Sequence, residues 1–333
     1  MNTEHRPAEG VADGQARVLG LPVGRSALPA TMLRVRDAAA VQKAVFDPAL
    51  KQFPDAFRAS DPVFPTPEET RAWQTARASA LAAVRDGVAA SPWAQALVLR
   101  GSVLMALWFG DRAREPGDLD FVVVPDSWRM EEERTAELLA GVAAAAGEWS
   151  AGLTEGVRID PAGAVCEDIW TYERVPGRRM MLPWTSPDSP GGWIQLDFVF
   201  GESLPQPPER VGLPTGGTLH GATPALSLAW KVMWVVNDMY AQGKDLYDAV
   251  LLAERCALPN ALLQEVFRSG GEPAAPGRWR LLGRDLDEAL HHVEWRHFAD
   301  EYPEFTGREQ EFVDRLRTAL APTFADDPAD EEV

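Results

Sequence analysis

The sequence predicts a mixed α/β domain followed by a helical domain, and two observations support this fold class. First, apolar runs typical of strands, "AQALVLRGS", "DLDFVVVP" and "WIQLDFVFGE", alternate with helical segments up to about residue 205. Second, the segments after the Pro- and Gly-rich stretch "SLPQPPERVGLPTGGT" have helical periodicity. We therefore expect an α/β (α+β) fold in which helices flank a mixed central sheet, with a helical domain at the C-terminal end.

The elements of the first domain follow from local signals. Thr66 is a candidate N-cap with Glu69 three residues later, a capping-box spacing that predicts the start of a long helix. The strand in "AQALVLRGS" ends at Gly101 and Ser102, a short helix follows in "SVLMALWFG", and "DLDFVVVP" is the second strand. "MEEERTAELLAGVAAAAGEW" predicts an amphipathic helix, and residues 150–190 predict several short strand-like pieces before the strand in "WIQLDFVFGE".

Three further helices are predicted in "PALSLAWKVMWVVNDMYAQ", "KDLYDAVLLAERC" and "PNALLQEVF", and a last helical pair follows them. The domain boundaries follow from these elements. We expect an N-terminal arm over residues 1–60, an α/β core over 61–205, a helical domain over 206–322 and an acidic, disordered tail over 323–333.

Composition limits the kind of protein this is. The 333 residues carry a formal net charge of −18, and a body this acidic repels polyanions, which disfavours generic nucleic-acid binding. The two cysteines lack a CxxC spacing, and the chain has neither a secretory signal pattern nor a run of about 18 apolar residues. These features indicate a cytoplasmic protein without a membrane span. The adjacent Arg178 and Arg179 could form a local basic patch, but the favoured interpretation is that they are solvated surface residues.

Two aspartates stand at the mouth of the predicted core strand in "GDLDFVVVP". Asp118 and Asp120 are two residues apart, so on a strand their side chains project from the same face. Neighbouring carboxylates repel each other unless a cation lies between them, and Mg²⁺ prefers oxygen ligands. Taken alone, the pair also fits a solvated strand end. The same letters recur at Asp285 and Asp287, but there the surroundings are helical and the two side chains diverge.

Two further features favour a metal site. Asp197 stands inside the apolar strand "WIQLDFVFGE", where a lone acid needs a partner or a metal. If this strand pairs beside the strand of Asp118 and Asp120, three carboxylates converge into the ligand set of a two-metal phosphoryl-transfer site. Upstream of them, Gly101 allows close backbone approach, and the helix N-terminus at Ser102 suits a phosphate group.

The helical part adds residues that could neutralise phosphate charge. Lys231 lies on an apolar helix, where its side chain either reaches solvent or points at an anion. "GKDLYDAV" contributes Lys244, Asp245 and Asp248, and the two aspartates share a helical face because they are three residues apart. The pattern is also typical of a helix start, where aspartate is favoured. Lys231 and Lys244 could offset phosphate charge during a transfer reaction.

The order "LRGS … DLDF … LDFVF … AWK … GKDLYD" resembles the DNA polymerase β-type nucleotidyltransferase superfamily, where a Gly-Ser turn precedes an Asp-x-Asp strand and a third acid follows. More closely, it is similar to the AbiEii/AbiGii toxin nucleotidyltransferases, which include the MenT toxins. These share the Gly-Ser turn, the Asp-x-Asp pair, a helical lysine and a later [RK]D-x-x-D motif, here within about residues 95–255. The resemblance implies a nucleotidyltransferase fold whose helical domain completes the nucleotide site, with an NTP as substrate and Mg²⁺, or Mn²⁺ in its place, as the metal.

The resemblance also implies roles for single residues. The implied metal ligands are Asp118, Asp120 and Asp197. The implied catalytic set is Asp118, Asp120, Asp197, Lys231 and Asp245, with Asp197 as the third acid or as the base that activates the acceptor. The implied nucleotide contacts are Gly101, Ser102, Lys231, Lys244 and Asp248. Which of Asp245 and Asp248 faces the site is left open.

The leading interpretation is a Mg²⁺-dependent nucleotidyltransferase that moves a nucleoside monophosphate from an NTP to an acceptor hydroxyl and releases pyrophosphate. The resemblance to the toxin branch implies a role in a toxin–antitoxin or phage-defence system, RNA (the tRNA 3′ end) as the acceptor, and a cognate antitoxin protein as partner. An alternative keeps the chemistry but has a small molecule or a protein as the acceptor, as in antibiotic-modifying or biosynthetic enzymes. A second alternative is an inactive fold that serves as a binding module, which the intact carboxylates and lysines disfavour.

Overall fold

The structure is a computed structural model that describes residues 34–46, 57–153, 156–171, 175–270 and 280–326. Most of the expected N-terminal arm and residues 327–333 of the expected tail lie outside these ranges. The chain divides into two compact units. Among the described residues, the sheet unit comprises those up to Leu107, Arg114–Gly201 and Arg210–Gly221, and the helical unit comprises Trp108–Ala113, Glu202–Glu209 and those from Ala222 onwards.

The described part of the sheet unit contains one large sheet of eight strands. These are β3 (Leu97–Arg100), β4 (Asp118–Val123), β5 (Arg158–Ile159), β6 (Val165–Thr171), β7 (Val175–Thr185), β8 (Gly192–Val199), β9 (Glu209–Gly212) and β10 (Thr218–Gly221). Their order is β5-β7-β8-β4-β3-β10-β9, and β6 also pairs with β7. Because β4 runs parallel to β8 and antiparallel to β3, the predicted mixed central sheet is confirmed. A separate antiparallel pair is formed by β1 (Ala44–Phe46) and β2 (Phe57–Ala59).

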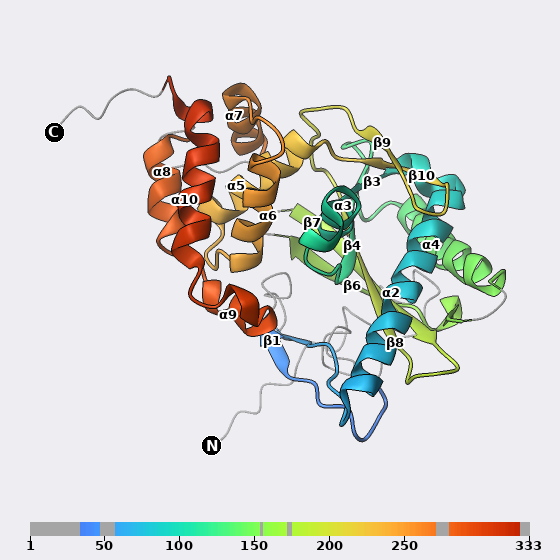
Figure 1. The fold of residues 1–333 in the computed structure, drawn as a ribbon. Coiled ribbons are helices and arrows are strands. Elements are labelled where there is room, and N and C mark those ends of the chain that lie inside the picture. Colours follow the sequence, from blue (N-terminus) through green and yellow to red (C-terminus); the bar gives the residue numbers. More distant parts are fainter. Residues whose placement is uncertain (1–33, 47–56, 154–155, 172–174, 271–279, 327–333) are drawn as a thin grey trace, which may run out of the picture. The chain divides into compact units, whose positions relative to one another are not determined.

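Within the described residues, three α-helices begin in the sheet unit: α2 (Pro67–Ala90), α3 (Ser102–Phe109) and α4 (Glu133–Ala151). The predicted capping box is present at the start of α2, where the Thr66 hydroxyl accepts from the Glu69 amide and the Glu69 carboxylate accepts from the Thr66 amide. Helices α2 and α4 lie side by side (Figure 1), and α2 also packs against β4 and β8. A Cβ at Gly87 of α2 would lie 2.8 Å from the Ala145 carbonyl oxygen of α4, so this glycine allows the two helices to approach closely.

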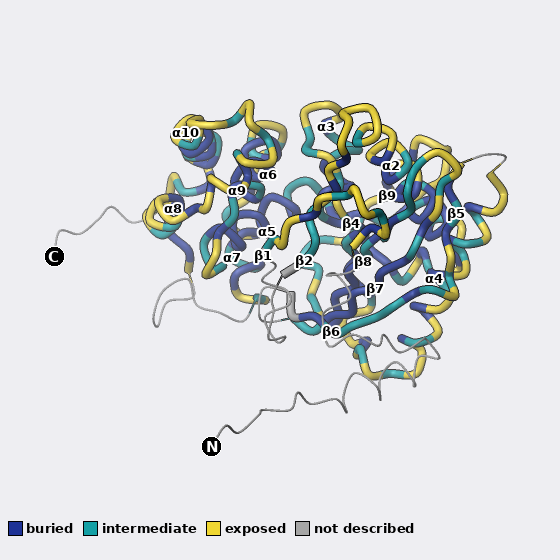
Figure 2. The backbone as a smooth tube through the Cα atoms, turned by 90° about the horizontal axis from the view of Figure 1, so that it is seen from below, coloured by how far each residue is buried: buried dark blue, intermediate teal, exposed yellow. Residues whose placement is uncertain are grey.

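The central strands have two different faces. On one face, Leu119 and Phe121 of β4 and Leu196 and Phe198 of β8 are fully buried, and the two phenylalanine rings stack with their centroids 5.7 Å apart. Figure 2 shows the central strands largely in the buried colour. The opposite face carries the alternate residues of the same strands, and Asp120 is among them. The apolar face therefore anchors the two strands, and the acidic residues follow from the alternation.

Two parts of the sheet were not predicted. Residues 150–190 were expected to hold short strand-like pieces, but Val175–Thr185 forms the long strand β7, which pairs with β5, β6 and β8. The Pro- and Gly-rich stretch was expected to be a linker, yet it contains β9 and ends at the first residue of β10, which pairs in parallel with β3. A Cβ at Gly221 would lie 2.6 Å from a Val211 methyl carbon, so glycine lets β9 and β10 pack closely. Tertiary pairing therefore outweighs the poor strand propensity of glycine.

The helical unit confirms the predicted helical character of the C-terminal part. Its α-helices are α5 (Pro224–Asn237), α6 (Gly243–Ala253), α7 (Asn260–Ser269), α8 (Gly283–Leu290), α9 (Trp295–Glu301) and α10 (Glu309–Leu320). Helix α5 packs against α6, α7 and α8, while α10 packs against α6. The described residues also form short 3-10 helices at Pro92–Ala96, Gly110–Arg112, Pro161–Gly163, Pro303–Phe305 and Ala321–Phe324. No helix in the described ranges is long and apolar enough to cross a membrane.

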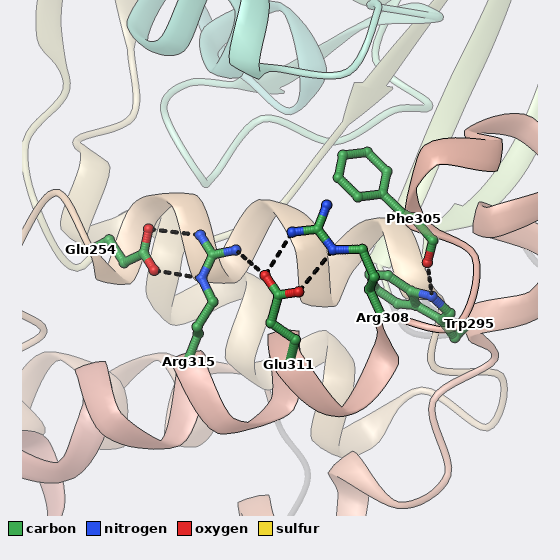
Figure 3. A network of polar contacts seen from close by, with 6 residues as sticks. All are labelled: Glu254, Trp295, Phe305, Arg308, Glu311 and Arg315. Carbon is green, nitrogen blue, oxygen red and sulfur yellow. Dashed lines mark hydrogen bonds and ion pairs between the residues drawn. The ribbon is translucent and has the colours of Figure 1, made fainter.

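A polar network covers an aromatic cluster where α10 meets α6 and α9. The rings of the cluster belong to Tyr247, Trp295, Phe298, Phe305 and Phe312. Figure 3 shows Arg315 of α10 between two carboxylates, with its fork on Glu254 at 2.7 and 2.9 Å. Glu311 also receives two hydrogen bonds from Arg308, at 2.8 and 2.7 Å. The Arg315 and Arg308 guanidinium groups both lie over the Phe312 ring, so the network and the aromatic cluster form one packed element.

Candidate active site

Three aspartates come together on the polar face of β4 and β8. The parallel register places Asp120 directly opposite Asp197 and Asp118 directly opposite Gln195. One carboxylate oxygen from each of Asp118, Asp120 and Asp197 lies within 4.8 Å of the others. We call these three residues the acid cluster. The sequence predicted that the three carboxylates converge if the two strands pair. The strands do pair, and the carboxylates lie together.

The Gly-Ser turn between β3 and α3 supports two members of the acid cluster. Gly101 has a φ of +74°, and a Cβ there would lie 2.2 Å from Oδ2 of Asp120, so a glycine is needed for both its backbone and its small size. The Ser102 hydroxyl is buried and donates to Oδ1 of Asp118 at 3.3 Å. The phosphate contacts predicted for Gly101 and Ser102 stay predictions, and what the structure shows is their role beside the aspartates.

Neutral and cationic donors also hold the third acid. The Gln195 amide donates to Oδ2 of Asp197 at 3.2 Å and to Oδ2 of Asp118 at 3.4 Å. Arg179 of β7 donates from Nε to Oδ1 of Asp197 at 2.8 Å and from Nη2 to Oδ2 at 2.7 Å. This is a two-bond fork between a guanidinium and a carboxylate, the geometry that makes such pairs strong and directional. Asp197 therefore already has a cationic partner within the protein.

The expectation that Arg178 and Arg179 are solvated surface residues is wrong. Their exposed fractions are 6% and 2%, because they lie in the middle of β7 with a strand paired on each side. Consecutive residues of a strand point to opposite faces, so each arginine pairs with a different carboxylate: Arg179 with Asp197, and Arg178 with Asp168. Burial lowers the pKa of Arg178 below its ordinary value.

Charged residues cross the sheet in a single line. Arg100 of β3 lies opposite Asp120, Asp120 opposite Asp197, Asp197 opposite Arg179, and Arg179 opposite Glu167 of β6. Residues directly opposite each other project from the same face. We call this line the charge row. Its centre is a carboxylate pair, and an arginine stands on each side of that pair.

The acid cluster has the donor chemistry of a site for a hard divalent cation. It offers carboxylate oxygens without sulfur or imidazole donors, the set that favours Mg²⁺, Mn²⁺ or Ca²⁺. Its oxygens lie within 4.8 Å of one another, near the ~3–4 Å that separates neighbouring oxygens around one Mg²⁺ ion. Hydrogen bonds and the close contact at Gly101 hold the carboxylates in place. The residues therefore fit a divalent metal.

The other predicted site residues lie in the helical unit. The ammonium group of Lys231 on α5 lies 2.6 Å from Oδ1 of Asp245 and 3.0 Å from Oδ2 of Asp248, both on α6. The exposed fractions of the three side chains are 6%, 4% and 0%. We call these residues the Lys231 cluster. The anion at which Lys231 points is thus this aspartate pair, and both acids contact it. Lys244, near the start of α6, is half-buried.

The two short motifs with the same letters have different surroundings, as predicted. Asp285 and Asp287 lie on α8, where Asp285 accepts from the Leu282 amide at 2.8 Å and Asp287 accepts from Arg317 of α10 at 2.6 Å. Asp285 therefore binds the backbone at the start of α8, and Asp287 pairs with an arginine of α10. The sequence did not lead us to assign Arg179, Arg100 or Gln195 to the site. The signal that could have found Arg179 is its place directly before the apolar stretch "MMLPW".

Comparisons with known proteins place the chain in one family by its sequence. No curated protein matches the chain. Two solved structures from Helicobacter pylori are similar: JHP933, with 13% identity and a TM-score of 0.44 over 78% of this chain and 93% of that one, and a candidate nucleotidyltransferase, with 14% identity and a TM-score of 0.45 over 76% and 95%. Residues 83–324 match the sequence model described as nucleotidyl transferase AbiEii toxin of type IV toxin–antitoxin systems. This match covers most of the chain, which therefore belongs to the AbiEii nucleotidyl transferase toxin family.

Proposed function

We propose that this protein is a metal-dependent nucleotidyltransferase that moves a nucleoside monophosphate from an NTP to a hydroxyl group and releases pyrophosphate. The observation that carries the proposal is the acid cluster, three carboxylates on adjacent parallel strands in a member of a nucleotidyl transferase family. Such a ligand set suits phosphoryl transfer, which depends on positioning and on neutralising charge at the phosphate oxygens.

In the proposed reaction, the acceptor oxygen forms a bond to the α-phosphorus while the bond from that phosphorus to the bridging oxygen breaks. The electron pair of the broken bond leaves with pyrophosphate. When bound, Mg²⁺ or Mn²⁺ supplies neutralisation of the phosphate charge. Asp118, Asp120 and Asp197 would hold it. Arg179 donates to both oxygens of Asp197 and so stabilises its charged form. We therefore assign Asp197 to metal binding rather than to the role of the base, and the hydroxyl proton passes to solvent.

For the helical unit, we propose that Lys231, Lys244, Asp245 and Asp248 form its nucleotide-binding element. The family match spans these residues, and its description as a nucleotidyl transferase supports this assignment; so does the buried cluster that three of them form. Lys231 orients both aspartates, and the half-buried Lys244 is the cation that we propose for the triphosphate. A Lys244→Met variant should raise the KM for NTP without changing the free energy of unfolding. An unchanged KM would remove Lys244 from the nucleotide contacts.

We propose RNA, at the tRNA 3′ end, as the acceptor, a cognate antitoxin as the protein partner, and the cytoplasm, where NTPs and tRNA occur, as the location. The type IV toxin–antitoxin description of the family supports the antitoxin. The net charge of −18 favours the alternative acceptor, a small molecule or a protein, because an acidic body repels RNA. An inactive fold that acts as a binding module is the remaining alternative.

A labelling experiment separates these possibilities. The purified protein is incubated with each α-labelled NTP and Mg²⁺, together with total RNA, a small-molecule extract or a protein extract. We expect label on tRNA; label on another fraction would move the acceptor, and no label in any fraction would favour the inactive fold. Asp120→Asn should lower the transfer rate by at least ~100-fold, because even the loss of a residue that only supports a metal ligand can cost that much activity. The matched Asp285→Asn variant changes the same type of residue on α8 and should transfer at the wild-type rate.

A further inference from the structure

We propose that Arg179 is a resident counter-charge of the acid cluster, so that the free protein binds divalent metal weakly and takes it up together with the nucleotide. This inference rests on the metal site of the proposed function and adds a role for a residue outside the motifs. Arg179 belongs to β7, which neighbours the acid-bearing strand β8 but carries none of the three acids.

The first step is the geometry of the Arg179 fork. Its two hydrogen bonds, at 2.8 and 2.7 Å, engage both oxygens of Asp197 at once. Arg179 is 2% exposed and Asp197 7% exposed, so little water screens the pair. A guanidinium stays protonated throughout the working pH range. The negative charge of Asp197 is therefore offset at all times, whether or not a metal ion is present.

The second step is the charge row. Asp120 and Asp197 each have an arginine directly opposite on the outer neighbouring strand, Arg100 and Arg179 respectively. Asp118 stands outside this row, opposite Gln195, and its carboxylate accepts from the neutral groups of Ser102 and Gln195. The three carboxylates therefore attract a cation much less strongly than three unbalanced charges would.

The third step follows from what an NTP brings. Mg²⁺ in nucleotide sites is usually held by one or two carboxylates together with phosphate oxygens of the substrate. A triphosphate adds negative charge and oxygen ligands at the point where Arg179 has offset the charge of Asp197. Metal and nucleotide should therefore bind with positive coupling, and each should raise the affinity of the other by the same factor.

The test measures Mn²⁺ binding to the full-length protein by electron paramagnetic resonance, with and without a non-hydrolysable NTP analogue. We expect the analogue to tighten Mn²⁺ binding to the wild-type protein by ~10-fold or more, within the usual range of coupling between sites. Arg179→Gln removes the charge and should bind Mn²⁺ ~10-fold more tightly than wild type in the absence of nucleotide. Arg179→Lys keeps the charge and should bind Mn²⁺ nearly as weakly as wild type, although the fork is lost.

Arg178→Gln is the matched control, because Arg178 is the next residue of the same strand and pairs with Asp168 on the opposite face. It should leave Mn²⁺ affinity unchanged, and an equal tightening in this variant would show a general loosening of the sheet and overturn the proposal. Equal Mn²⁺ affinity in wild type and Arg179→Gln would also overturn it. If Arg179→Gln does not fold, the wild type decides, since tight Mn²⁺ binding without nucleotide contradicts the inference. An absence of Mn²⁺ binding under every condition would instead reject the metal site and with it the proposed function.

Discussion

Replacing Gly101 by alanine should separate the stability of the fold from the geometry of the acid cluster. Two effects act at this position. The φ of +74° lies in the left-handed region, where a residue with a Cβ pays ~1–2 kcal/mol. The new Cβ would also lie 2.2 Å from Oδ2 of Asp120, while ordinary contact begins at 3.4 Å. The Asp120 carboxylate must therefore retreat by about 1 Å, or the turn must move by a similar distance.

The backbone effect and the displaced carboxylate are measured by different assays and differ in magnitude. The backbone effect predicts that the free energy of unfolding falls by ~1–2 kcal/mol, which leaves most of the protein folded at room temperature. The displaced carboxylate predicts a larger functional loss, because a misplacement of ~1 Å in a catalytic group can cost ~100-fold in rate. Urea denaturation measures the first quantity, and the rate of transfer at saturating NTP and metal measures the second.

Gly216→Ala is the matched control. Gly216 lies in the same sheet unit and has a φ of +91°, and a Cβ added there would meet no other atom within 4 Å. This variant should lose a similar ~1–2 kcal/mol of stability and retain full activity. The reasoning would be refuted if Gly101→Ala kept its transfer rate within a few-fold of wild type, or if Gly216→Ala lost as much activity as Gly101→Ala.

Three further predictions concern ionisable groups elsewhere in the protein. Lys231→Met leaves the two buried aspartates of the Lys231 cluster without their shared cation. It should lower the free energy of unfolding, measured by urea denaturation, by ~3–5 kcal/mol. Lys244→Met, at a half-buried site, should change this free energy little. Hydrogen bonding from Arg315 lowers the pKa of Glu254 below its ordinary value of 4.5, so the pair stabilises the fold above pH 4.5 and this contribution is lost as the pH falls through the lowered value. Acid titrations of unfolding should therefore show a shallower decline for Glu254→Gln than for wild type, and parallel curves would contradict this assignment. Burial raises the pKa of the Cys166 thiol to about 12, so iodoacetamide at pH 8 should label it ~100-fold more slowly in the folded than in the urea-unfolded protein.

Much of the acid cluster could be predicted because its geometry follows from strand periodicity. Asp118 and Asp120 had to share a face, and Leu119 and Phe121, which alternate with them, had to face the core. The pairing of β4 with β8 had to be assumed, because a single sequence does not indicate which strands become neighbours in the sheet. The second Asp-Leu-Asp, at Asp285 and Asp287, was separated from the first by its helical context alone.

The charge row could not be predicted for the same reason. A rule that a lone acid inside an apolar strand needs a partner singled out Asp197, and it applies equally to Arg179 in β7. Each residue turns out to be the other's partner, so a buried carboxylate is not by itself evidence for a metal. The metal assignment depends instead on an imbalance, because Asp118 adds a third carboxylate that accepts from the neutral groups of Ser102 and Gln195. An excess of negative charge held within 4.8 Å is what a divalent cation can stabilise, and the two arginines of the row reduce that excess.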